Sequence, residues 1–201
     1  MCSFFFGGLA RGYRWDDQGC CAPESAKGNE KIPTNLPHEQ NSFVGREREL
    51  HQLHRLVGVT RALTLCGAGG IGKTRLALQV GAAVADEFPD GAWFVELGDL
   101  RQPDLVVSRV ASAVGVGEEP GRPLLETLTD ALRPRRLLLT LDNCEHLIDA
   151  CARLCQRLLA SSPDLRVIAT SREPLHVAAE TVWQVQPLSV APEHHSIPSL
   201  A

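Results

Sequence analysis

The segment Gly67-Ala-Gly-Gly-Ile-Gly-Lys73-Thr74 is the part of this sequence best suited to chemistry. It fits the phosphate-loop pattern, in which glycine is followed by four residues and then by Gly-Lys and serine or threonine. Glycines let the backbone curl until successive N–H groups point at one phosphate, and a helix that begins there adds partial positive charge. Lys73 can reach the β- and γ-phosphate oxygens of a nucleotide, and the Thr74 hydroxyl can ligate Mg²⁺. The pattern therefore predicts a nucleotide-binding loop.

A glycine-rich turn that matches this pattern by accident is the alternative. The chain contains only three lysines, Lys27, Lys31 and Lys73, so few positions can supply the lysine that the pattern requires. The flanking residues also fit, because the apolar run 62–66 precedes the loop and a helical pattern covers 73–85 after it. Strand, loop and helix is the order that a phosphate loop needs, so we favour nucleotide binding.

Asp142 is a second candidate, because it ends the apolar run 137–141 as the carboxylate of a Walker B strand does. A carboxylate in this place can hold a magnesium water opposite Thr74. Alternatively, or in addition, Asp142 or Asn143 could cap the following helix. Asn143 occupies the position at which many ATPases of this broad class place a glutamate that activates water, so no general base is obvious. We expect slow hydrolysis at most, with the nucleotide acting as a switch ligand.

Arg172 is a third candidate, because Thr170-Ser-Arg follows the predicted strand 165–169. Ligands of open α/β sheets bind at the carboxyl ends of the strands. From there Arg172 could approach a γ-phosphate. The spacing alone is equally compatible with a surface arginine or a helix cap.

Strand-like and helical segments alternate along the chain and must position these residues. The predicted strands cover 62–66, 92–97, 137–141, 165–169 and 181–185, and the predicted helices 47–57, 73–85, 104–114, 123–132 and 145–160. This alternation predicts an α/β fold in which helices cover both faces of a five-stranded parallel sheet.

Composition divides the chain into three parts. Residues 1–40 contain several glycines and prolines but no helical or alternating apolar period, so we expect a flexible leader. A nucleotide-binding domain is expected over 41–188 and an irregular tail over 189–201. The length of 201 residues and the hydrophobic fraction of 44% suit one such folded domain.

Charge and cysteine content exclude several classes of protein. The net charge of −4 lacks the basic excess of a broad nucleic-acid surface. No apolar run approaches the roughly 20 residues of a membrane span, so we expect no membrane partner. The seven cysteines form no CxxC pair, which argues against a zinc ribbon or a disulfide framework and favours the cytoplasm. Cys151 and Cys155 share the leucine face of a predicted helix, so we expect them in the core.

Four segments together resemble the nucleotide-binding domain of signal-transduction ATPases with numerous domains. They are FVGRE, from Phe43 to Glu47, followed by GAGGIGKT, LLLTLDNCEHL and ATSREPL. The sequence is most similar to bacterial ATPases of the NB-ARC type in large transcriptional regulators, from about residue 36 to 188. The resemblance implies a three-layer P-loop NTPase fold. It also implies that strand 165–169 lies between the phosphate-loop strand and the Walker B strand, which brings Arg172 near the phosphates.

The resemblance also implies a role for each matching position. Asp142 matches the Walker B carboxylate and Arg172 the sensor arginine, so these two and Lys73 are the candidate catalytic residues. Thr74 and Asp142 are the candidate residues for Mg²⁺. Val44, Gly45 and Arg46 match the segment that contacts adenine and ribose. The remaining candidates for contact with ATP or ADP are the loop and the residue after it: Gly67, Ala68, Gly69, Gly70, Ile71, Gly72, Lys73, Thr74 and Arg75.

These observations predict an ATP- or ADP-binding switch module of a regulator-like protein. Proteins that it resembles continue into a helical lid and a winged-helix region, and this sequence ends at Ala201, so we expect both to be missing. Protein partners or those C-terminal domains are then the expected partners besides nucleotide, and no direct DNA binding by this segment is expected. The alternative is a non-enzymatic interaction fragment that keeps the fold without competent nucleotide binding. A small-molecule or nucleotide kinase is disfavoured, because no arginine-rich lid follows Asp142.

Overall fold

The computed structural model describes residues 13–15, 21–23, 32–37 and 45–188. The chain divides into two compact units, Met1–Lys31 and Ile32–Ala201. In the first, strands β1 (Tyr13–Trp15) and β2 (Cys21–Pro23) pair antiparallel, although no strand pattern was predicted there. The second unit contains the described helices and the remaining strands. Within the described residues, no helix is both long enough and apolar enough to cross a membrane.

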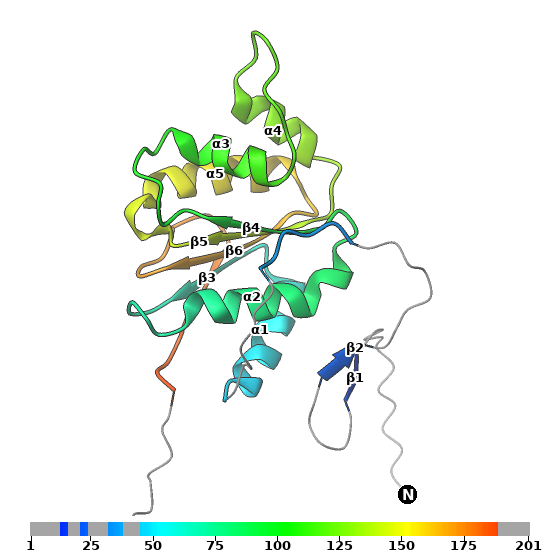
Figure 1. Ribbon diagram of the computed structural model, residues 1–201, viewed down its shortest axis with the longest axis vertical. Coiled ribbons are helices and arrows are strands. Elements are labelled where there is room, and N and C mark those ends of the chain that lie inside the picture. Colours follow the sequence, from blue (N-terminus) through cyan, green and yellow to red (C-terminus); the bar gives the residue numbers. More distant parts are fainter. Residues whose placement is uncertain (1–12, 16–20, 24–31, 38–44, 189–201) are drawn as a thin grey trace, which may run out of the picture. The chain divides into compact units, whose positions relative to one another are not determined.

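A five-stranded parallel sheet forms the centre of the second unit (Figure 1). Its strands in spatial order are β4 (Ala92–Glu96), β5 (Leu138–Asp142), β6 (Arg166–Ser171), β3 (Ala62–Cys66) and β7 (Glu180–Gln184). The predicted α/β class and five-stranded parallel sheet are therefore confirmed. The strand order also confirms that β6 lies between the phosphate-loop strand β3 and the Walker B strand β5.

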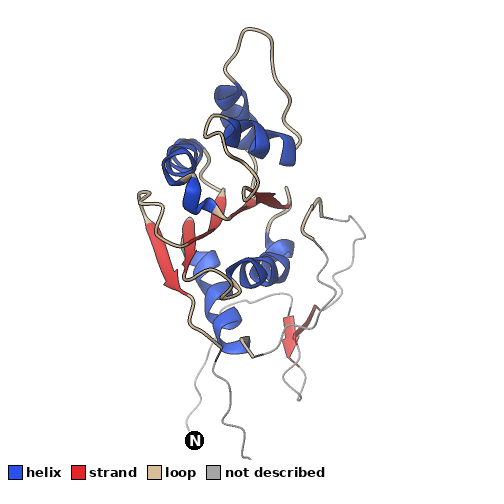
Figure 2. Ribbon diagram, turned by 60° about the vertical axis from the view of Figure 1, so that its left-hand side comes forward, coloured by secondary structure: helices blue, strands red, loops and turns tan. Residues whose placement is uncertain are grey.

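Helices cover both faces of this sheet (Figures 1 and 2). On one face lie α1 (Glu47–Val59) and α2 (Lys73–Val84), which the short 3-10 helix η1 (Ala85–Glu87) extends. On the other face lie α3 (Leu105–Ala113), α4 (Leu124–Leu132) and α5 (Ile148–Ser161). The domain is therefore the three-layer structure that the resemblance implies.

Each face of the sheet has its own hydrophobic core. Alternate residues of β5 point to opposite faces, so Leu139 and Leu141 pack in the core under α3, α4 and α5, and Leu138 packs in the core under α1 and α2. Cys151 and Cys155 are fully buried free thiols in the first core, as predicted. Burial raises the pKa of the Cys155 thiol far above its ordinary value.

The helix predicted over 145–160 is wrong at its beginning. The chain first forms the 3-10 helix η2 (Cys144–His146), and α5 begins only at Ile148. The helical pattern breaks at Leu147, whose φ is −134°. Both Cys144 and Leu147 are buried in the core. Their packing therefore stabilises this turn, although the apolar pattern of the sequence continues through it with a helical period.

The free edge of β4 is covered by residues 32–37. The Thr34 hydroxyl donates to the carbonyl of Ala92 at 2.8 Å. The Asn35 side chain donates to the carbonyl of Phe94 at 2.9 Å and accepts from the Phe94 N–H at 2.6 Å. The second compact unit begins at Ile32, so this segment belongs to it. Apart from an isolated parallel bridge between Thr34 and Ala92, residues 32–37 form no strand, and their sequence Ile-Pro-Thr-Asn-Leu-Pro has no alternating apolar period to detect.

Candidate nucleotide-binding site

The glycine-rich loop joins β3 to α2, as its pattern predicted. Gly70 and Gly72 have φ values of +77° and +94°, a region that a residue with a side chain enters only with strain. Gly72 is the last residue before α2, and no side chain caps the first turn of that helix. The first N–H groups of α2 therefore lack a side-chain acceptor, which is the arrangement that binds anions.

Lys73 lies folded over this loop. Its side chain is buried, with 8% of the residue exposed, and Nζ donates to the carbonyls of Gly67 at 2.9 Å and Ala68 at 3.0 Å. An ammonium group has three N–H donors, so one remains for another acceptor. The charge is thus held at the loop, where it can attract a phosphate.

Asp142 meets Thr74 across the sheet edge. The Thr74 hydroxyl donates to Asp142 Oδ1 at 2.8 Å, and only 5% of Asp142 is exposed. The two residues are 68 positions apart in the sequence, and they meet because β3 and β5 end at the same edge of a parallel sheet. The structure therefore brings together the two residues predicted to hold Mg²⁺.

Thr170 belongs to the same cluster and was not among the predicted site residues. Its hydroxyl donates to Asp142 Oδ1 at 2.6 Å and accepts from the Asn143 N–H at 2.9 Å. The pairing of Leu141 with Ala169 brings Asp142 and Thr170, the next residues of β5 and β6, to the same edge. A hydroxyl at the carboxyl end of the strand beside Asp142 was the available signal. Thr170 could be recognised as a site residue only once the order and register of the strands were known.

Arg172 lies beside the phosphate loop. A Cβ atom added to Gly69 would be 3.6 Å from an Nη atom of Arg172. Arg172 Nε also donates to Glu145 Oε1 at 3.1 Å, with 67% of the arginine side chain exposed and 16% of the glutamate. Glu145 was not predicted as a site residue, and its link to Arg172 depends on the turn through η2.

Arg46 has a position that its pattern did not predict. The residue is 4% exposed, and Nη2 donates to the carbonyls of Ile71 and Gln186, both at 2.9 Å. Nη1 donates to the Glu49 carboxylate, with a shortest distance of 3.0 Å. The guanidinium thereby ties the beginning of α1 to the phosphate loop and to the segment after β7.

The other residues predicted to contact adenine or ribose precede α1. The N–H of Gly45 donates to Glu47 Oε1 at 3.1 Å. Hydrogen bonds from the N–H groups of Glu47 itself and of Gly45 lower the pKa of the Glu47 carboxyl. Val44 lies outside the described residues. Arg75, the last predicted contact, is exposed in the first turn of α2.

Two proteins of Mycobacterium tuberculosis are similar in sequence to this chain. An uncharacterized protein of Mycobacterium tuberculosis is 44% identical over 149 residues, which cover 74% of this chain and 38% of that protein. A putative HTH-type transcriptional regulator of the same species is 45% identical over 141 residues, or 70% of this chain and 16% of the regulator. The chain thus spans less than half of the length of each relative. The second relative, named as a transcriptional regulator, agrees with the predicted resemblance to ATPase domains of large regulators.

A solved structure and a family model bear on the fold. The ORC2 protein of Aeropyrum pernix, solved as ADPNP–ADP complexes, has a TM-score of 0.51 and is 14% identical, over 78% of this chain and 50% of ORC2. At that identity the likeness shows the fold alone. The model of a family described as an AAA domain matches residues 58–175, from the end of α1 through β3, the phosphate loop, the Walker B strand and β6 to Leu175. The chain belongs to the AAA domain family.

Proposed function

We propose that this domain binds ATP and ADP at its phosphate loop together with Mg²⁺, and that the nucleotide acts as a switch ligand within a regulator-type protein. The observation that carries the proposal is the hydrogen bond from Thr74 to Asp142 at 2.8 Å, which joins the phosphate-loop helix to the Walker B strand. A glycine-rich turn that matched the pattern by chance would have no reason to meet a buried carboxylate from a strand so distant in sequence.

The residues present fit Mg²⁺. This ion prefers oxygen ligands, and it is commonly held by one or two protein oxygens, phosphate oxygens and water. The Thr74 hydroxyl donates its proton to Asp142, so its oxygen lone pairs remain available to a cation. Thr74 would therefore ligate the ion and Asp142 would hold its water. Bound there, Mg²⁺ supplies positive charge that neutralises the phosphate oxygens.

The loop and Lys73 account for recognition of phosphate. The uncapped N–H groups of α2 and the remaining donor of Lys73 converge on the same short loop. Charge-assisted hydrogen bonds from such groups select for an anion with several oxygens. The side chain of Arg172 adds a second cation beside Gly69.

Arg172 and Glu145 support the proposed switch. In this structure the exposed Arg172 is held by Glu145 at 3.1 Å beside the loop. A γ-phosphate would compete with Glu145 for this arginine, and a diphosphate would compete less. Asn143 lacks a carboxylate to activate water, so we expect hydrolysis to be slow. A relative named as a transcriptional regulator supports a role for the whole protein in transcription.

Calorimetry with the full chain tests this function. We expect wild type to bind ATP and ADP with Mg²⁺, and Lys73→Ala to lose affinity by about tenfold or more, because a charged hydrogen-bond donor is removed. Arg133→Ala is the control, because Arg133 is an exposed cation that precedes β5, at the opposite end of that strand from Asp142. It removes the same charge and should bind as wild type does.

Two results would contradict the proposal. Equal nucleotide affinity of wild type and Lys73→Ala would show that the phosphate loop is not part of the nucleotide-binding site. If saturating ATP and ADP leave the melting temperature of the wild type unchanged, the alternative of an interaction fragment that does not bind nucleotide is favoured. A ligand that binds the native state must raise its stability.

A further inference from the structure

We infer that Thr170 is a positioning residue for the metal side of this site: its hydroxyl holds the Asp142 carboxylate and the Asn143 turn in the arrangement that Mg²⁺ requires. The inference rests on the proposed function and assigns to β6 a part in metal-dependent nucleotide binding. Thr170 is not proposed to touch the metal or the nucleotide.

The Thr170 hydroxyl uses both of its hydrogen-bonding capacities in this cluster. It gives its only proton to Asp142 Oδ1 at 2.6 Å and accepts the Asn143 N–H at 2.9 Å. Thr170 is 1% exposed and Asp142 5% exposed, so water cannot readily replace either bond. In a buried environment such bonds are strong, and the loss of a partner is costly.

Thr74 and Thr170 donate to the same oxygen of Asp142, at 2.8 Å and 2.6 Å. One donor comes from α2 and the other from β6, so the carboxylate is held from two elements and cannot rotate freely. With Oδ1 occupied by two protons, Oδ2 is the oxygen left to accept from a magnesium water. Groups that orient a metal-holding carboxylate in this way commonly change metal affinity by about 10–100-fold when they are mutated.

The second bond of Thr170 supports the turn after Asp142. Asn143 has a φ of +63°, in the left-handed region that residues other than glycine rarely adopt. Its N–H is satisfied by Thr170, which fixes this turn as the chain leaves β5. Two residues beyond Asn143 lies Glu145, and two residues beyond Thr170 lies Arg172, and these side chains meet at 3.1 Å. The Thr170 hydroxyl therefore joins the two segments that end in this ion pair.

Thr140 offers a matched control on the neighbouring strand. It lies on β5, it is 0% exposed, and within the described part of the chain its Oγ1 has no hydrogen-bond partner. Replacement by valine at Thr140 or Thr170 makes the same change of shape and polarity in the same sheet. Only at Thr170 does it remove bonds to Asp142 and Asn143.

The test measures affinity for a non-hydrolysable ATP analogue with Mg²⁺ and with EDTA, using the full chain. The ratio of the two dissociation constants is the gain that the metal provides. We expect Thr170→Val to reduce this gain by about tenfold or more and to leave binding in EDTA unchanged. Thr170→Ser retains the hydroxyl and should retain the gain, and Thr140→Val should behave as wild type.

Every other result contradicts either this inference or the proposed function. An unchanged metal gain in Thr170→Val overturns the inference, and so does an equal loss of affinity with and without Mg²⁺, which would mean a general structural role. If Thr170→Val does not fold, Thr170→Ser and Thr170→Ala make the same comparison, and equal gains in those two overturn the inference. Absence of any metal-dependent nucleotide binding by wild type would instead overturn the proposed function.

Discussion

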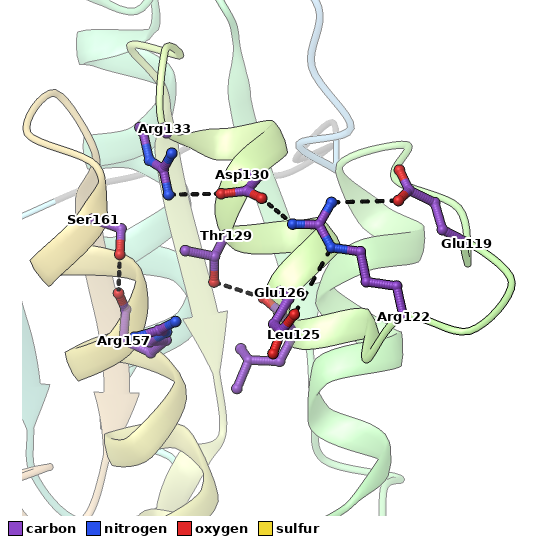
Figure 3. Close-up of polar contacts among 9 residues, drawn as sticks. All are labelled: Glu119, Arg122, Leu125, Glu126, Thr129, Asp130, Arg133, Arg157 and Ser161. Atoms are coloured by element: carbon purple, nitrogen blue, oxygen red, sulfur yellow. Dashed lines mark hydrogen bonds and ion pairs between the residues drawn. The ribbon is translucent and has the colours of Figure 1, made fainter.

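Two polar networks in this domain use similar chemistry at different depths. The Asp142 network, made of Asp142, Thr74, Thr170 and the Asn143 N–H, lies at the edge of the sheet, where Asp142 and Thr170 are buried and Thr74 and Asn143 are partly exposed. The α4 network lies on the surface around α4, and Figure 3 shows its members. Its central Arg122 contacts Asp130, Glu119 and Glu126, and Arg133 contacts Asp130 at 2.6 Å.

The comparison teaches that the number of ion pairs is a poor guide to importance. In the α4 network, 36% of the Arg122 side chain and 40% of the Asp130 side chain are exposed, so water and salt compete for both charges. The Asp142 network has no ion pair among these members, only short hydrogen bonds from groups fixed by three elements. Burial and fixed direction make its bonds harder to replace. Function should therefore depend on the smaller network.

The largest contrast is expected between Asp142→Ala and Asp130→Ala. Asp142→Ala removes the carboxylate for a magnesium water and leaves the Thr74 and Thr170 hydroxyls without their acceptor, so Mg²⁺-dependent ATP binding should fall by about 100-fold or more. Asp130→Ala removes the same side chain from the α4 network and should leave the dissociation constant unchanged. Titration of a fluorescent ATP analogue in Mg²⁺ measures both. Similar affinity in the two variants would show that burial at the sheet edge does not mark function here.

Most of the sheet could be predicted from sequence because most of its strands contain a short apolar run. The run Ala62–Cys66 coincides with β3, and every residue in it is buried. Lys73 and Thr74 were placed correctly on α2 because the glycine pattern dictates a backbone form independently of the rest of the fold.

The rest depended on contacts between residues far apart in the sequence. Arg46 meets the carbonyl of Gln186, 140 positions away, and nothing local to Arg46 indicates that contact. Thr170 acquires its place from the register of β5 and β6. The break at Leu147 follows from burial of that side chain, which overrides a helical period that continues through it. The apolar pattern of the sequence thus located the helices and strands. Tertiary packing determined which partners the polar side chains contact.

A second contrast compares two arginines through their effects on stability. Arg46→Met removes a buried guanidinium that serves two carbonyls and Glu49, so the free energy of unfolding should fall by about 3 kcal/mol. Arg122→Met makes the same substitution in the α4 network and should have a much smaller effect. Urea unfolding followed by circular dichroism compares them. If Arg46→Met is as stable as wild type, the three-way contact of Arg46 contributes no net stability.

The smallest effect belongs to Arg122, and its dependence on pH and salt identifies its origin. The hydrogen bond from Arg122 is the main cause that holds the pKa of Asp130 below its ordinary value of 3.8. A carboxyl whose pKa is lowered in the native state adds stability above its unfolded pKa and loses that contribution as pH falls through the folded value. Arg122→Met should therefore lower the melting temperature by about 2 °C or less at neutral pH, and the difference from wild type should shrink as the pH falls below the ordinary Asp130 pKa of 3.8. It should also shrink in about 1 M salt, where the Debye length is about 3 Å. A difference that persists in high salt and acid would mean that Arg122 acts through packing of its aliphatic stem, and the α4 network would then resemble the buried one more than its exposure suggests.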